Sequence, residues 1–113
     1  DDFAISGGTL VDVSYALTDK GAKKVYAALS HNVLSEEGIK KIDASPIEFL
    51  VSTDTLECPA ASLSNKIRFI SAAPMFAQAV KIIHDRAPMS TMFEQRVSKR
   101  LLDMSFAEQQ TLI

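Results

Sequence analysis

The segment D-D-F-A-I-S-G-G-T-L, residues 1–10, leads through a Ser-Gly-Gly-Thr turn into a pattern of helical spacing. Glycines at such a turn let backbone N–H groups face one point without obstruction by a Cβ atom. A helix that starts directly afterwards adds unpaired amides and the positive end of its dipole, which together form a cradle for a phosphate group. The two neighbouring carboxylates can hold sugar hydroxyls or a divalent cation. The segment therefore predicts a ligand that carries both a phosphate and a diol.

The composition is that of a single globular domain. Of the 113 residues, 47% are hydrophobic and 23% are charged, which is ordinary for a soluble protein. A formal net charge of −2 provides no basic surface for nucleic acid, and no apolar run is long enough to span a membrane. Cys58 is the single cysteine, which excludes an internal disulfide and favours a reducing, cytoplasmic setting. We interpret Cys58 as a loop residue without a functional role.

Apolar spacing predicts helices that alternate with strands along the chain. The expected elements are a helix at residues 9–20, strands at 25–29, 47–52 and 67–70, a helix from 35 to about 45, a helix beginning at Pro74, and a final helix at 94–113. Gly21 is expected to cap the end of the first helix, and Ser35 the start of the second. This alternation indicates an α/β fold with a mainly parallel sheet, flanked by helices and joined by right-handed crossovers.

Three further expectations concern particular side chains. Ser30-His31-Asn32 is expected to break the strand at 25–29. The helix that begins at Pro74 is expected to bury one face, formed by Phe76, Ala79, Val80 and Ile83. The last segment carries an apolar stripe that is expected to pack on the domain or to meet another subunit, formed by Phe93, Val97, Leu101 and Met104.

Four polar clusters are expected at the carboxyl edge of the sheet, where ligands bind in open α/β folds. They are Asp1-Asp2 with residues 6–9, Ser30-His31, Thr53-Asp54-Thr55, and Ser71. Thr53-Asp54-Thr55 is either a plain turn or a functional loop, and the residues leave both readings open. We interpret His31 as a loop histidine bonded to backbone, since one histidine alone makes no metal site. Ser71 is expected to cap the following helix.

Several segments resemble one enzyme family, in the same order along the chain. Residues 1–9 resemble the phosphoribosyl pyrophosphate loop of type I phosphoribosyltransferase folds. Segments that resemble ribose-phosphate pyrophosphokinases, also called phosphoribosyl pyrophosphate synthetases, are 21–26, 30–35, 51–55, 83–84 and 89–93. The resemblance implies that residues 1–93 form the C-terminal portion of a phosphoribosyltransferase-like domain and residues 94–113 a helical extension. It also implies an ATP-binding half upstream, so we expect this chain to be a piece of a longer protein and to be inactive alone.

The resemblance implies an enzyme that transfers diphosphate from ATP to ribose 5-phosphate, with Mg²⁺ as cofactor. Asp1 and Asp2 would contact the ribose hydroxyls and lie near Mg²⁺. The residues that would cradle the 5-phosphate are Ser6, Gly7, Gly8 and Thr9. Ser90 and Phe93 match a region that, in many members, helps to form a regulatory phosphate or nucleotide site between subunits. The resemblance further implies a homo-oligomer.

Ile5 departs from the family pattern. It stands where the loop usually carries a third acid, and an isoleucine side chain can neither bind a hydroxyl nor act as a base. Two alternatives therefore stay open beside the pyrophosphokinase. One is a non-catalytic associated or regulatory subunit of that enzyme. The other is a phosphoribosyltransferase that consumes phosphoribosyl pyrophosphate.

Overall fold

The computed structural model describes residues 1–93, and the helix and stripe predicted for residues 94–113 lie outside the described residues. The chain divides into two units, Asp1–Ile70 and a second that begins at Ser71. The elements of the first unit are β1 (Phe3–Ala4), α1 (Gly8–Asp19), β2 (Val25–Asn32), α2 (Glu36–Ala44), β3 (Ile47–Thr53), the 3₁₀ helix η1 (Pro59–Leu63) and β4 (Ile67–Ile70).

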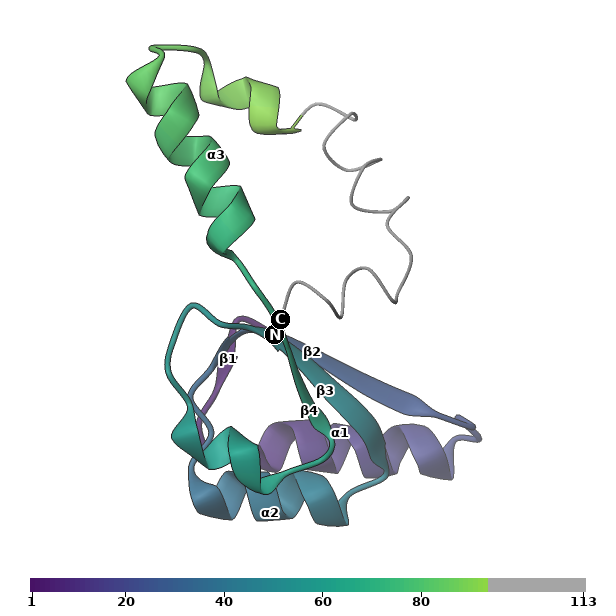
Figure 1. Ribbon diagram of the computed structural model, residues 1–113. Coiled ribbons are helices and arrows are strands. Elements are labelled where there is room, and N and C mark those ends of the chain that lie inside the picture. The colour runs from purple at the N-terminus through teal and green to yellow at the C-terminus, as the bar shows by residue number, and fades with distance from the viewer. Residues whose placement is uncertain (94–113) are drawn as a thin grey trace. The chain divides into compact units, whose positions relative to one another are not determined.

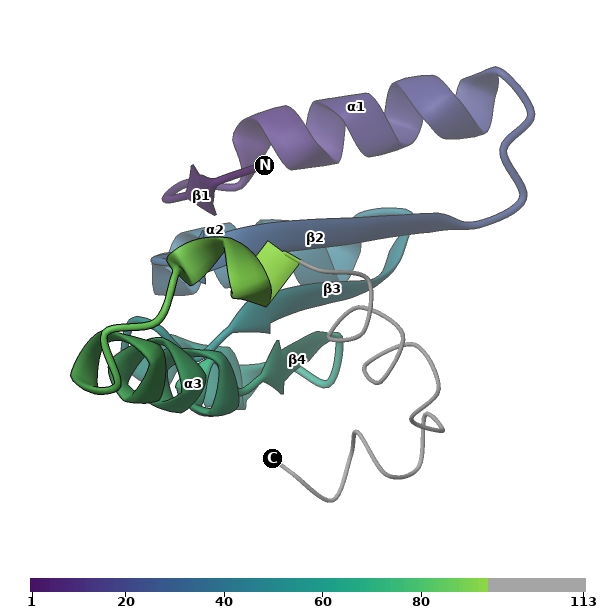
Figure 2. The ribbon, with the colours of Figure 1, turned by 90° about the horizontal axis from the view of Figure 1, so that it is seen from above.

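The strands lie in the sheet in the same order as along the chain, and all three neighbouring pairs are parallel. Right-handed crossovers that always step in one direction place every connection on one face of the sheet. Figure 1 shows this arrangement, with α1 and α2 on the same side of the strands. Figure 2 shows the four strands from above, with α2 behind them. The predicted α/β fold with a parallel sheet is therefore confirmed.

The core lies between the sheet and its two helices. Ile39 and Ile42 of α2 and Ile47 and Leu50 of β3 are at most 1% exposed. Burial of a side chain of this size contributes roughly 1.5–3 kcal/mol to folding. Alternation along each strand then directs the intervening side chains to the opposite face of the sheet.

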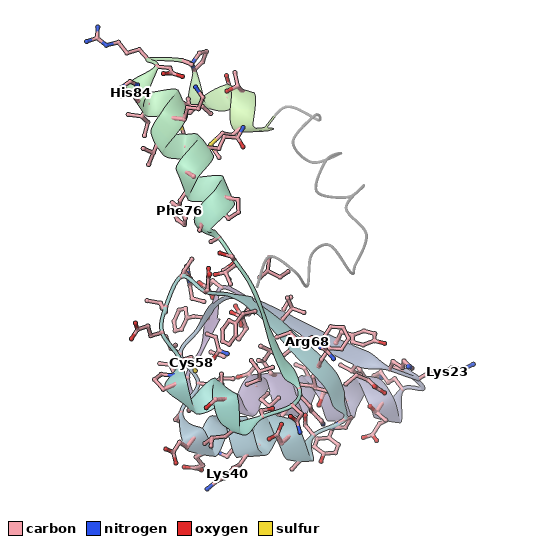
Figure 3. The ribbon with its side chains drawn as sticks, in the orientation of Figure 1. Lys23, Lys40, Cys58, Arg68, Phe76 and His84 are labelled. Carbon is pink, nitrogen blue, oxygen red and sulfur yellow. The ribbon has the colours of Figure 1, made fainter. Side chains whose placement is uncertain are left out.

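The opposite face carries aromatic and basic side chains. Tyr26 and Phe49 lie with their ring centroids 4.6 Å apart, and the Arg68 guanidinium stands 5.4 Å from the Phe49 centroid. Figure 3 shows Arg68 on the side of the strands away from the helices. Tyr26 is 52% exposed, so no element of Asp1–Ile70 buries this end of the face.

The helix ends follow the capping rules that the sequence suggests. After α1, Gly21 takes the left-handed conformation with φ of +96°, as predicted. At the start of α2, the Ser35 hydroxyl accepts a hydrogen bond from the Gly38 amide at 3.1 Å, which confirms the predicted cap. The helix ends at Ala44, since Pro46 disfavours helical geometry at the residue before it.

Strand β2 is longer than the sequence suggested. Ser30-His31-Asn32 was expected to break the strand, but β2 continues through Asn32. The reason is the pairing with the segment that contains the edge strand β1: the Ser30 amide donates to the Asp1 carbonyl at 3.1 Å, and the His31 amide donates to the Asp2 carbonyl at 2.8 Å. Polar residues thus remain in the strand because β1 provides partners for their backbone groups.

The second unit contains α3 (Ala73–His84) and the 3₁₀ helix η2 (Met89–Phe93). Pro74 lies in the first turn of α3, as predicted. The predicted buried face is wrong: Phe76 is 55% exposed, Val80 and Ile83 are each 66% exposed, and Ile82 is the buried residue of this helix. The short 3₁₀ helix η2 contacts α3. Figure 3 labels Phe76 near the start and His84 at the end of α3.

Among the described residues, none of the helices has the length and apolar character that a membrane span requires.

Candidate functional site

The loop between β1 and α1 turns through a left-handed glycine. Gly7 is the N-cap of α1 with φ of +69°, a conformation that L side chains rarely adopt. No side chain among residues 1–93 caps this helix, so the amides of its first turn remain available for another acceptor. A pocket of about 190 Å³ lies at this turn, lined by Asp1 and by residues 3–10. The structure therefore brings the predicted phosphate-binding residues Ser6, Gly7, Gly8 and Thr9 together at a helix N-terminus.

Gly8 leaves the pocket open. A Cβ atom built on Gly8 has the Ser6 hydroxyl oxygen, 3.8 Å away, as its nearest neighbour. The position therefore accepts a side chain without disturbing the rest of the protein, but that side chain would occupy the space beside the first-turn amides.

Gly38, in the first turn of α2, supports the loop, and this role is not among the sequence-based predictions. A Cβ atom on Gly38 would lie 2.9 Å from the Ile5 carbonyl oxygen and 3.1 Å from the Ser6 carbonyl oxygen. The Ser35 amide also donates to the Ile5 carbonyl at 3.0 Å. The start of α2 thus holds the backbone of the loop at close range. The available signal was a glycine in the first turn of a predicted helix, where glycine is unfavourable unless backbone packs against it.

Asp1 and Asp2 are exposed and directly precede the short strand β1. One oxygen of each carboxylate is engaged locally: Asp1 accepts from the Asp2 amide at 2.8 Å, and Asp2 accepts from the Phe3 amide at 3.0 Å. These contacts fix the orientation of both carboxylates relative to the backbone.

The acid pair offers carboxylate oxygens of the kind that Mg²⁺ binds, but it does not form a closed metal cage. Within residues 1–93, no group of three or more His, Cys, Asp or Glu side chains is arranged to hold a metal. Mg²⁺ keeps several waters and is usually bound by one or two carboxylates together with substrate phosphates. Asp1 and Asp2 supply that donor set if the substrate provides the remaining oxygens.

His31 has a side-chain partner, contrary to the interpretation that it is bonded to backbone. Its Nδ1 atom lies 2.6 Å from the Thr55 hydroxyl oxygen. Thr55 in turn lies 2.9 Å from the Thr53 hydroxyl, which donates to the Ser30 carbonyl at 2.5 Å. Two of the predicted polar clusters, Ser30-His31 and Thr53–Thr55, are therefore joined by hydrogen bonds.

Cys58 contributes to packing. Its sulfur lies 3.6 Å from the Asn32 side-chain oxygen and 3.5 Å from the Leu34 carbonyl oxygen, so the single thiol hydrogen can point to either, and the half-buried side chain packs against the core. It lies close to η1 in Figure 3. Asn32 is fully buried, and its side-chain nitrogen has no hydrogen-bond partner among the described residues.

The remaining predicted residues belong to the second unit. The Ser71 hydroxyl accepts from the Ala73 amide at 3.3 Å, which agrees with its expected role at the start of α3. Ser90 and Phe93 both lie in η2, and Ser90 is exposed.

A family model described as the phosphoribosyl synthetase-associated domain matches residues 1–94. The chain belongs to this family. A ribose-phosphate pyrophosphokinase from Caldanaerobacter subterraneus subsp. tengcongensis is 41% identical over 93 residues, which is 82% of this chain and 29% of that protein. A ribose-phosphate pyrophosphokinase from Listeria ivanovii is 39% identical over 94 residues, which is 83% of this chain and 30% of that protein.

The fold of this chain is also similar to that of a solved structure. The crystal structure of phosphoribosylpyrophosphate synthetase from Mycobacterium smegmatis matches with a TM-score of 0.72 and 25% identity, over 77% of this chain and 29% of that one. The resemblance to pyrophosphokinases is therefore confirmed. The family member described here spans 29–30% of the length of these curated relatives.

Proposed function

We propose that this chain is the sugar-phosphate-binding part of a ribose-phosphate pyrophosphokinase, which transfers diphosphate from ATP to ribose 5-phosphate and yields phosphoribosyl pyrophosphate. The observation that carries the proposal is the uncapped, glycine-initiated N-terminus of α1 at a pocket that Asp1 also lines. Such a helix end binds a phosphate, and a neighbouring carboxylate binds hydroxyls. Ribose 5-phosphate carries both groups.

The residues act by binding and orientation. The amides of Gly8 and Thr9, with the hydroxyls of Ser6 and Thr9, bind the 5-phosphate, while Asp1 and Asp2 accept hydrogen bonds from the ribose diol. Mg²⁺ supplies charge neutralisation during the transfer and would be held by the free oxygens of the two carboxylates. A sugar fixed at both ends presents its 1-hydroxyl in one orientation, which lowers the entropic part of the barrier.

In this proposal, catalytic turnover requires further segments of the protein beyond this domain. The domain described here spans 29–30% of the length of its relatives. The proposal assigns the ATP-binding half and the rest of the catalytic machinery to chain outside this domain. The chain alone is then inactive. The wider proposal includes residues 94–113 as a helical extension, a homo-oligomer with a regulatory phosphate or nucleotide site at Ser90 and Phe93, and a cytoplasmic location.

A second candidate function rests on Ile5. This side chain is 60% exposed and lines the pocket at the position where the family pattern carries an acid. An apolar residue there removes a ligand for hydroxyls or metal without disturbing the fold. The alternative is a non-catalytic associated subunit that keeps the sugar-phosphate site and the contacts between subunits.

Calorimetric titration with ribose 5-phosphate and Mg²⁺ tests the proposal. The wild-type protein is expected to bind, and Gly8→Val is expected to abolish binding because its side chain fills the cradle. Ala16→Val is the matched control, since it adds a β-branched side chain to an exposed position of the same helix, far from the pocket. An absence of heat with the wild-type protein, or equal binding by Gly8→Val, would remove the assignment.

A further inference from the structure

A β-bulge at Ser30 interrupts the pairing of β2 with β3. Leu29 is paired with Ser52 and His31 with Thr53, so Ser30 is an extra residue on β2. Bulges of this kind leave backbone groups without ladder partners and often lie beside binding sites. Here the Ser30 carbonyl accepts from the Thr53 hydroxyl at 2.5 Å, so a side chain replaces the missing ladder bond.

Counting hydrogens fixes the direction of the bonds in this cluster. Three short contacts run from His31 Nδ1 to Thr55 Oγ1 (2.6 Å), to Thr53 Oγ1 (2.9 Å) and to the Ser30 carbonyl (2.5 Å). A carbonyl only accepts, so the Thr53 hydroxyl, which lies nearest to it, donates to it. The Thr55 hydroxyl also lies 3.5 Å from this carbonyl, and it donates to Thr53 when all three short contacts are hydrogen bonds. The hydrogen in the remaining contact belongs to His31 Nδ1. We call this chain of four residues the hydroxyl relay.

The hydroxyl relay ends on the Ser30–His31 peptide, whose amide bonds to Asp2, while the amide of the preceding peptide bonds to Asp1. The Ser30 amide donates to the Asp1 carbonyl at 3.1 Å, and the His31 amide donates to the Asp2 carbonyl at 2.8 Å. Asp1, Ser30 and Thr53 also line one hollow of about 360 Å³ on the sheet face away from the helices. The backbone of Asp2 is therefore held by the bulged peptide whose carbonyl the relay bonds, and the backbone of Asp1 by the peptide next to it.

We propose that the hydroxyl relay positions Asp1 and Asp2 for the ribose hydroxyls, with His31 as a positioning residue held in the Nδ1-protonated tautomer. The proposal rests on the proposed function for the identity of the sugar. It assigns no role in phosphate binding to the relay, because the cradle is built by α1 and supported by Gly38 of α2. Loss of the relay should therefore affect the sugar part of the ligand and spare the phosphate part.

Comparing two ligands separates these parts. Inorganic phosphate occupies only the cradle, whereas ribose 5-phosphate also meets the acid pair. Thr55→Val removes the central hydroxyl at nearly constant shape and is expected to weaken ribose 5-phosphate binding about threefold to tenfold, with phosphate affinity unchanged. Thr55→Ser keeps the hydroxyl and is expected to bind both ligands like the wild type.

Two substitutions at His31 test the nitrogen atom that the relay uses. The amide of His31→Asn reaches the position of Nδ1 and should preserve ribose 5-phosphate affinity, whereas the amide of His31→Gln reaches the position of Nε2 and should not. Nitrogen-15 NMR of the neutral imidazole is expected to show the proton on Nδ1, a readout that needs neither ligand nor a variant.

Several outcomes would overturn the inference and leave the proposed function standing. They are equal losses for phosphate and ribose 5-phosphate in Thr55→Val, no loss for either ligand, and a ring proton on Nε2. A wild-type protein that binds phosphate without any preference for the sugar phosphate would instead overturn both the inference and the sugar-binding role of Asp1 and Asp2 in the proposed function. Failure of the wild type to bind phosphate at all would refute the cradle, and with it the proposed function.

Discussion

Gly38→Ala should displace the phosphate loop at little cost to stability. The added Cβ atom would lie 2.9 Å from the Ile5 carbonyl oxygen, where ordinary contact begins at 3.4 Å, so one backbone must move by the difference, 0.5 Å. Overpacking of this kind costs about 1–3 kcal/mol, and the exchange of glycine for alanine within a helix returns about 1 kcal/mol. The net loss of unfolding free energy is therefore about 0–2 kcal/mol.

Gly38→Ala should weaken phosphate binding more clearly than it lowers the free energy of unfolding. A misplacement of 1 Å can lower the rate of an enzymatic reaction by about a hundredfold, so half that shift at the cradle is expected to weaken phosphate binding roughly tenfold. Calorimetric titration with inorganic phosphate gives the affinity, and urea unfolding gives the stability of the same preparation.

Gly21→Ala is the matched control for this experiment. Its Cβ atom would meet nothing within 4 Å, but its φ of +96° strains any L residue. The left-handed conformation costs about 1–2 kcal/mol, so this variant should be as destabilised as Gly38→Ala while it binds phosphate normally. Wild-type phosphate affinity in Gly38→Ala would refute the claim that α2 sets the position of the loop.

Three further variants probe other parts of the molecule. Ile42→Ala empties a fully buried site and should lower the unfolding free energy by about 2–5 kcal/mol in urea titrations; a loss below that range would mean that the core collapses around the gap. A hydrogen bond and the charge of Lys41 hold the pKa of Glu37 below 4.5, so Lys41→Met should raise that pKa in NMR titrations. Because the folded pKa is the lower one, the stabilisation is present above pH 4.5 and is lost as the pH falls through the folded value, with no effect near neutrality. Ile5→Asp should strengthen Mg²⁺ binding in the presence of ribose 5-phosphate, and an unchanged Mg²⁺ affinity would show that this position does not face the metal.

Elements with a strong local pattern could be predicted from the sequence. The start of β2 at Val25, the cap at Ser35 and the strand at 67–70 follow from side-chain periodicity and capping chemistry, which act within a few residues. The end of β2 could not be predicted in this way, because Ser30 and His31 stay in the strand through bonds to Asp1 and Asp2, which are distant in sequence. The predicted buried face of α3 was wrong for a related reason. An apolar stripe on a helix indicates one face, but it does not say which other element covers that face.

The candidate site shows the same division. The phosphate cradle could be predicted because its residues are contiguous and their chemistry is local. Gly38 and the partnership of His31 with Thr55 depend on contacts between elements that lie far apart in the chain. A glycine in the first turn of a helix and hydroxyl residues at the ends of two neighbouring strands were the only traces of these contacts in the sequence.

The matching order of strands in the sheet and in the chain also bears on how the protein folds. Each strand needs to close only one connection to reach its neighbour, so the entropy lost at every step is small. The most deeply buried apolar side chains, Ile39, Ile42, Ile47 and Leu50, lie within one short stretch, which favours nucleation around α2 and β3. Among the described strands, β1 pairs with β2 alone, so a sugar phosphate bound beside Asp1 and Asp2 would protect backbone amides at that edge against exchange with solvent.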